Sequence, residues 1–326
     1  MTSDGAEIRI FRAGDEKGLI EGLESSRHTR LSLEDWSWSY PVAAGGRPIV
    51  VALADGEIVA HAGGVATAFH LGGRTVPALA IADEFVRLSR VGESEREKLA
   101  SDLLEYLLAE FGGEEKFSFV YRLAGRGESA GGTAIELPPV NLLLRLEAVR
   151  PRLGRLAYRA EPARDWEPRL DELWRRVRTS YPFAAVRDAE TALSRHAGHP
   201  TGRRHRFLVF PRFSSRAVAF AAFESDGTAC RCVDLVWDHD EPGALDMLCH
   251  LSQRLASQFG VQEERIVLAG DAAALSRLEA SGFRSEAGFG DMTLTVFSLP
   301  RGVRSDELAG RCYITQTDLD PLRRAG

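Results

Sequence analysis

Residues 76–111 read VPALAIADEFVRLSRVGESEREKLASDLLEYLLAEF, and the rest of the chain is organised around this stretch. Its first part, Val76–Leu88, is apolar except for Asp83, Glu84 and Arg87, which predicts a largely buried strand. Its last part, Glu95–Phe111, predicts a helix, because a leucine or phenylalanine recurs at every fourth position from 99 to 111.

A turn at residues 89–94, which contains Gly92, joins the two parts. Free backbone N–H groups and the positive end of the helix dipole converge where a helix begins. A strand that leads through a glycine-containing turn into a helix is therefore a common place for a phosphate group to bind. This turn is the predicted anion-binding part of the chain.

Length and composition indicate a globular protein of about two domains. The chain has 326 residues, of which 44% are hydrophobic, and its formal net charge is −6. This charge predicts no attraction to nucleic acid or to anionic membranes. Residues 1–10 lack the features of a signal peptide, and no run of residues is long and apolar enough to span a membrane.

The four cysteines, all in the second half of the chain, do not have the spacing of a disulfide framework. Cys230 and Cys232 lack a second pair of ligands at the spacing of a zinc site, so we expect buried thiols and no metal. Together with the missing signal peptide, these features predict a cytoplasmic protein.

The order of predicted elements occurs twice. In the first half we expect a strand at 7–12, helices up to 26 and at 31–40, strands at 49–54 and 57–70 around the Asp55-Gly56 hairpin signal, the central unit, and strands at 117–121 and 137–147. In the second half we expect a strand at 156–159, helices at 166–181 and 187–196, strands at 207–210, 216–224 and 228–237, a helix at 244–259, a strand at 265–269, a helix at 272–281, a hairpin, and an edge strand within 312–319. An internal duplication explains this order most simply. It predicts an α/β fold with mixed (α+β) sheets in two lobes, 1–150 and 151–326.

This layout resembles the GCN5-related N-acetyltransferase (GNAT) family, as a tandem-lobe member with a degenerate pyrophosphate loop. Family members carry Gln/Arg-x-x-Gly-x-Gly/Ala in the loop after the central strand, whereas Ser89-Arg90-Val91-Gly92-Glu93-Ser94 keeps only the first glycine. The helix that runs into Gly282-Phe283 is similar to the penultimate helix of the family. The resemblance covers most of the chain.

The resemblance implies that an acyl-CoA lies in a gap between the central strand and the next parallel strand. Val86 and Leu88 would then face the pantetheine, and the pyrophosphate would lie against Arg90, Val91, Gly92 and Ser94. The turn also favours the opposite interpretation. Ser94 and Glu97 fit a capping box, whose side chains would occupy the N–H groups that a diphosphate needs.

Acyl transfer to an amine needs a base for the ammonium and an acid for the leaving thiolate. Asp83 and Glu84 are candidate bases, because burial in an apolar strand would raise the pKa of a carboxylate. The alternative is that one faces solvent and the other caps a backbone group or pairs with an arginine. Tyr121 lies where family members place a tyrosine acid, although a tyrosine at a strand end is often simply packed.

The second lobe is predicted to be a non-catalytic copy, because its equivalent turn at 237–244 is acidic and has no arginine or lysine. His196, His199 and His205 lie in an arginine-rich stretch that predicts a solvated basic loop in preference to a metal site.

The favoured function is an acyltransferase that moves an acetyl or other acyl group from acetyl-CoA or another acyl-CoA to a small-molecule or peptide amine. Two alternatives stay open: a catalytically silent binding module with this fold, and an acyl-ACP decarboxylase or aminoacyl transferase on the same fold.

Overall fold

The computed structural model describes residues 2–3, 6–27, 30–41, 46–87, 92–112, 116–125, 133–137, 140–145, 152–197, 204–286, 292–297 and 311–319. In the first half, the elements are β1 (Thr2–Ser3), β2 (Ala6–Ile10), α1 (Glu16–Arg27), α2 (Leu33–Ser39), β3 (Ile49–Ala54), β4 (Glu57–Leu71), β5 (Arg74–Val86), α3 (Glu93–Phe111), β6 (Phe119–Gly125), β7 (Thr133–Leu137) and β8 (Val140–Arg145).

The second half repeats this alternation of strands and helices. Its elements are the 3-10 helix η2 (Leu153–Ala157), β9 (Tyr158–Pro162), α4 (Pro168–Val177), the 3-10 helix η3 (Arg178–Ser180), β10 (Phe183–Ala185), α5 (Ala189–His196), β11 (His205–Pro211), β12 (Ala219–Ser225), β13 (Ala229–Trp237), α6 (Gly243–Phe259), β14 (Glu263–Ala269), α7 (Ala272–Ala280), β15 (Arg284–Ser285), β16 (Met292–Val296), β17 (Cys312–Thr315) and α9 (Gln316–Leu319).

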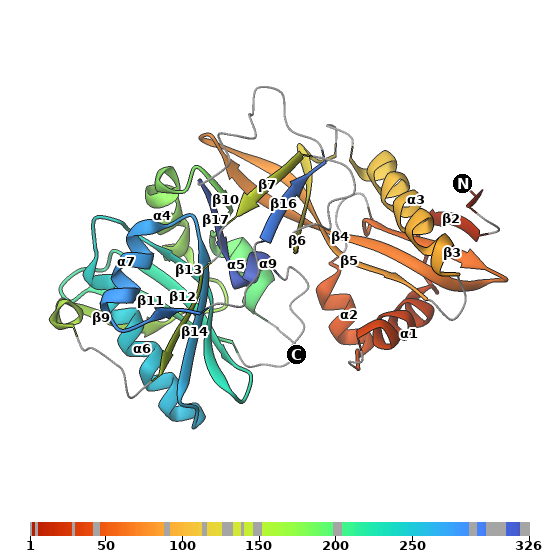
Figure 1. Ribbon diagram of the computed structural model, residues 1–326. Helices are drawn as coiled ribbons and strands as arrows, with labels where there is room; N and C mark the ends of the chain where they lie inside the picture. Colours follow the sequence, from red (N-terminus) through yellow and green to blue (C-terminus); the bar gives the residue numbers. More distant parts are fainter. Residues whose placement is uncertain are drawn as a thin grey trace.

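Lobe one is built on a sheet with the order β1-β2-β3-β4-β5-β6-β16-β7. All neighbours are antiparallel except β5 and β6, which run parallel where Ala78–Ile81 pair with Phe119–Arg122. Helix α3 covers one face of the sheet, and α1 and α2 cover the other (Figure 1). The hairpin between β3 and β4 turns at Asp55 and Gly56, whose φ angles are 51° and 80°, as the dipeptide predicted.

Lobe two has a sheet with the order β9-β11-β12-β13-β14-β8-β15. Its parallel pair is β13 and β14, through Ala229–Cys232 and Glu263–Ile266. The prediction of an α/β fold with mixed sheets in two lobes is therefore confirmed.

Each central strand carries a bulge at the same place. In lobe one, Gly63 pairs with Asp83 and Gly64 pairs with Ile81, so Ala82 is the extra residue of β5. Ile81 is also the last residue that β5 pairs with its parallel neighbour.

In lobe two, Ala222 pairs with Asp234 and Phe223 pairs with Cys232, so Val233 is the extra residue of β13. Cys232 is likewise the last residue paired with the parallel neighbour. A shared bulge at a shared register supports the hypothesis of an internal repeat.

Strands are exchanged between the halves of the chain. Strand β8 pairs with β14 in the sheet of lobe two, whereas β16 lies between β6 and β7 in the sheet of lobe one. Strand β10 pairs with β4, and β17 pairs with both β10 and β14 (Figure 1). The prediction of an edge strand within 312–319 is therefore wrong: β17 is an internal strand that connects the two sheets.

The junction of the lobes is a packed aromatic cluster. Phe69 of β4, Phe119 and Tyr121 of β6 and Phe183 of β10 are all buried, with ring centroids 4.9–5.8 Å apart. Burying each large apolar side chain contributes roughly 1.5–3 kcal/mol, so the lobes are held as one unit. In the part of the chain that the structure describes, no helix has the length and apolar character needed to span a membrane.

Candidate acyl-transfer site

The opening between β5 and β6 is the first feature of the candidate site. The two strands pair only as far as Ile81 and Arg122, yet β5 continues to Val86 and β6 to Gly125. In the described chain, the backbone of β5 beyond the bulge pairs with β4 on one edge only. This divergence is the geometry that the resemblance predicted for an acyl-CoA.

The structure separates the two candidate bases. Asp83 is 3% exposed and accepts a hydrogen bond from the hydroxyl of Tyr40, with 3.0 Å between the oxygen atoms. Glu84 is exposed, and its carboxylate lies 2.7 Å from a guanidinium nitrogen of Arg122. This ion pair joins β5 to β6 at the point where the strands diverge.

The predicted loop is described only at its end. Leu88, Arg90 and Val91 lie outside the described residues, as does the side chain of Ser94. Val86 is half-buried and packs against the apolar cluster under α3.

The predicted capping box is wrong in its residues. Helix α3 begins at Glu93, with Gly92 as its N-cap, two residues earlier than the periodicity indicated. Because the helix starts earlier, the acidic residue of the third helical position is Glu95 and not Glu97. The Glu95 carboxylate accepts a hydrogen bond from the N–H of Gly92 at 3.3 Å. A carboxylate therefore occupies the helix start, although not the one that was expected.

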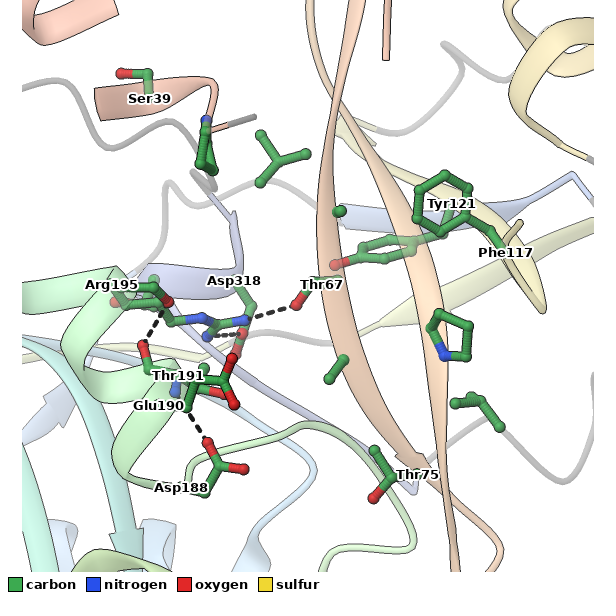
Figure 2. Close-up of a pocket in the computed structure, with 18 of the residues that line it drawn as sticks. Ser39, Thr67, Thr75, Phe117, Tyr121, Asp188, Glu190, Thr191, Arg195 and Asp318 are labelled. Atoms are coloured by element: carbon green, nitrogen blue, oxygen red, sulfur yellow. Dashed lines mark hydrogen bonds and ion pairs between the residues drawn. The ribbon is translucent and has the colours of Figure 1, made fainter. Parts of the chain in front are cut away.

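A pocket of about 440 Å³ lies between the lobes (Figure 2). It is bounded by the end of α2, the middle of β4, the start of β5, Tyr121 of β6, helix α5 and helix α9. Its size is within the range of small-molecule sites. The lining residues that carry polar or aromatic groups are Trp38, Ser39, Thr67, Thr75, Phe117, Tyr121, Asp188, Glu190, Thr191, Ser194, Arg195, Thr317 and Asp318.

Tyr121 lines this pocket, whereas Asp83 and Glu84 do not. Burial raises the pKa of the Tyr121 phenol above its ordinary value, and the nearby Asp318 carboxylate raises it further. The phenol is therefore protonated at neutral pH. Of the three predicted catalytic residues, the structure places only Tyr121 in the pocket.

A network of charged side chains extends from the pocket lining, at Arg195 and Asp318, into the core of the protein. Arg195 donates to Asp318 at 2.9 Å and to the Thr67 hydroxyl at 3.2 Å (Figure 2). Arg187, 1% exposed, lies 2.5 Å from the other oxygen of Asp318 and 2.9 Å from Asp234. Burial opposes ionisation of both carboxyls, but the arginines outweigh it and hold the pKa of each below its ordinary value.

The sequence analysis missed this network because its members are distant along the chain. Arg187 and Asp318, for example, are 131 positions apart. In the sequence, each member is a single charged residue in a predicted strand or helix, and such residues usually face solvent.

His196 corrects another prediction. It belongs to the stretch expected to be a solvated loop, but it is the last residue of α5 and is 3% exposed. Its Nε2 lies 3.1 Å from Asp234, and its Nδ1 lies 3.3 Å from Arg204. His205 is exposed, and His199 lies outside the described residues.

The charges that remain in the pocket lining are negative, because Arg195 offsets Asp318 and leaves Asp188 and Glu190. Asp188 caps α5 through the N–H of Thr191 at 2.9 Å, and Glu190 is exposed in the first turn of that helix. An acid-lined pocket favours a positively charged ligand.

The opening of lobe two is filled by the chain itself. Asp234, the counterpart of Asp83, binds Arg187, and the Arg187 guanidinium lies 4.8 Å from the centre of the Tyr313 ring. Tyr313 of β17 in turn donates to the carbonyl of Leu235 at 2.6 Å. Arg187, which lies between β10 and α5, and Tyr313 of β17 therefore fill the opening of lobe two that would correspond to the β5–β6 opening of lobe one.

Comparisons with solved structures identify the fold. A conserved protein of unknown function from Enterococcus faecalis V583, a probable N-acyltransferase, matches with a TM-score of 0.65 and 11% identity over 90% of this chain and 73% of that one. A GCN5-related N-acetyltransferase from Anabaena variabilis matches with a TM-score of 0.64 and 14% identity over 89% and 72%. Saccharomyces cerevisiae N-myristoyltransferase with bound myristoyl-CoA matches with a TM-score of 0.63 and 12% identity over 92% and 81%.

No family model and no curated protein matches the chain. The structural similarities nevertheless extend over both lobes. The chain therefore has the GNAT fold, the fold shared by these acetyl- and myristoyl-transferases.

Proposed function

We propose that the protein is an N-acyltransferase that moves an acyl group from acyl-CoA to an amine. The donor lies in the β5–β6 opening of lobe one, and the acceptor lies in the pocket between the lobes. The observation that carries this proposal is the position of Tyr121: it belongs to the parallel pair that forms the opening and also lines the acid-lined pocket of about 440 Å³.

The reaction in this proposal is direct attack in a ternary complex. The acceptor loses its ammonium proton to solvent, and the neutral amine attacks the thioester carbon, so that a C–N bond forms and the C–S bond breaks. The thiolate of CoA takes the proton of Tyr121, and the proton lost by the new amide nitrogen restores the Tyr121 phenol. Asp188 and Glu190 attract the protonated acceptor into the pocket. Asp83 and Glu84 do not line the pocket, so the proposal does not use either as the base.

Lobe two, proposed as residues 151–326, contributes α5 and α9 to the acceptor pocket and binds no donor. The opening of lobe two is filled around Arg187 and Tyr313, which supports the proposal that only lobe one binds the donor. The four cysteines are buried free thiols, which suits a reducing compartment such as the cytoplasm.

The test is thiol release from acetyl-CoA and from longer acyl-CoAs, measured across a panel of small amines and peptides. Tyr121→Phe should lower kcat by about a hundredfold or more and leave both KM values nearly unchanged, because only proton donation is lost. The matched control is Tyr158→Phe, which removes a hydroxyl that donates to Glu241 at 2.6 Å, outside the pocket lining. Equal loss of kcat in both variants would contradict the role of Tyr121.

One observation favours the alternative of a silent binding module. The ion pair between Glu84 and Arg122 crosses the opening that a donor must enter. If the pair keeps donors out, calorimetry will detect no binding of acyl-CoA to the wild type, and Glu84→Gln will bind it. Binding by the wild type with turnover of an amine would exclude the silent module.

A further inference from the structure

Tyr40 fixes the end of α2 to the central strand of lobe one. It follows the last residue of α2 and is 1% exposed, and its hydroxyl donates to Asp83, which is itself 3% exposed. Its backbone N–H donates to the carbonyl of Trp36 at 3.0 Å, and its own carbonyl accepts from Arg47 at 2.7 Å. Both the side chain and the backbone of this residue are therefore held.

The residues around Tyr40 form one wall of the acceptor pocket. Trp38, Ser39 and Pro41 line the pocket, whereas Tyr40 and Asp83 do not. The wall thus consists of the residues that flank a buried anchor. A change in the anchor would move these lining residues without removing any group that a ligand touches.

The opposite wall is anchored in the same way. Helix α5 lines the pocket through Asp188–Arg195, and its last residue, His196, contacts the buried Asp234 at 3.1 Å. Asp83 and Asp234 each follow the bulge of their central strand. In each lobe, a buried aspartate after the bulge therefore holds the carboxyl end of the second helix, and the pocket lies between these two helices.

We propose that Tyr40 and Asp83 form a positioning pair that determines how tightly the acceptor binds. The hydrogen bond between them sets the place of the Trp38–Pro41 wall relative to α5. This inference rests on the proposed function and gives Asp83 a structural task at the site in place of acting as a base. It is independent of which acyl group the donor carries.

The first experiment uses Tyr40→Phe, which removes only the hydroxyl. The KM for the acceptor amine should rise about five- to tenfold, because the buried hydrogen bond to Asp83 is lost, while kcat and the KM for acyl-CoA stay within about twofold. Tyr158→Phe is the matched control and should leave all three constants unchanged. A merely destabilised enzyme would lose active protein, which lowers apparent kcat and does not change KM, and that result would overturn the proposal.

Asp83→Asn separates positioning from proton transfer. The amide oxygen still accepts from Tyr40, so the acceptor KM should stay within about threefold of the wild type, whereas Asp83→Ala should match Tyr40→Phe. A loss of kcat of about a hundredfold or more in Asp83→Asn, with an unchanged acceptor KM, would show that Asp83 is the base and would overturn the proposal.

Hydrogen exchange tests the anchor without any activity. In Tyr40→Phe, amides of the peptide that covers residues 33–41 should exchange about tenfold faster than in the wild type, while the α5 peptide and the Tyr158→Phe protein stay unchanged. Unchanged exchange in residues 33–41 would overturn the positioning role. Faster exchange in a protein that transfers no acyl group would instead show that the anchor exists and that the proposed function is wrong.

Discussion

Glu264 is a buried carboxyl whose ionisation affects the folded state of lobe two. It lies in β14 and is 1% exposed, and it accepts a hydrogen bond from the hydroxyl of Ser252 of α6. Its other oxygen, Oε1, has no hydrogen-bond partner among the described residues. Burial raises the pKa of this carboxyl to about 8, so the group is mostly protonated at neutral pH.

This raised pKa makes stability depend on pH. The pKa of Glu264 is higher in the folded protein than in the unfolded one. Its contribution to the free energy of unfolding is therefore fully present below about pH 4.3 and is lost as the pH rises through about 8. Glu264→Gln keeps the shape without the charge, so it should be more stable than the wild type at pH 8 by on the order of 4–5 kcal/mol and equal to it at pH 4. Urea unfolding from pH 4 to 9 measures this difference.

The matched control for that series is Glu263→Gln. Glu263 is the neighbouring residue of β14, with a side chain 30% exposed that lies 3.2 Å from Arg265. Its substitution should shift stability only slightly at any pH, because a partly exposed ion pair contributes little. Parallel pH profiles for the wild type and Glu264→Gln would contradict the protonated state of Glu264.

In the proposed donor site, the start of α3 affects how tightly an acyl-CoA binds. A diphosphate placed there must displace the Glu95 carboxylate from the N–H of Gly92. Glu95→Gln removes one like charge, which should tighten acyl-CoA binding by about two- to fivefold. Isothermal titration with acetyl-CoA measures this change, and Glu105→Gln, an exposed residue further along α3, is the control. Equal affinity of Glu95→Gln and the wild type would place the diphosphate elsewhere.

Elements with a strong local signal were predictable from sequence. Strand β3 and the Asp55-Gly56 hairpin occur as expected, because the turn residues adopt the positive φ angles that the hairpin requires. Strand β10 was missed: it has three residues and forms only by pairing with β4 and β17. Strand β17 was predicted at the edge, because a strand of four residues carries no information about how many neighbours it has.

The candidate site, too, was predictable only where the signal is local in the sequence. Asp83 stood out because a carboxylate in an apolar strand is visible in the sequence, and Tyr121 because it lies where the family that the chain resembles places a tyrosine acid. The partners that give these residues their tasks, Arg195, Asp318 and Tyr40, were not predicted as site residues, since each contact depends on tertiary packing. The sequence therefore predicted the strand pair of the donor site and missed the acceptor pocket.

At the scale of the whole molecule, the exchange of strands makes the lobes interdependent. Strand β8, before the predicted boundary at residue 150, pairs with β14 through Val140–Arg145. Strand β16, after that boundary, pairs with both β6 and β7. Each half alone would leave strand edges without their partners, and an unpaired edge promotes aggregation.

We expect that neither residues 1–150 nor residues 151–326 folds as a stable monomer, whereas the two co-expressed halves assemble into a complex that unfolds in one transition. Half one alone lacks β16, and half two alone lacks β8, so backbone groups of β6, β7 and β14 would lose their hydrogen-bond partners. Size-exclusion chromatography and circular dichroism of the separate and co-expressed halves test this expectation. A half that is monomeric and unfolds cooperatively at the temperature of the full chain would show that the exchanged strands are dispensable and that the lobes are independent domains.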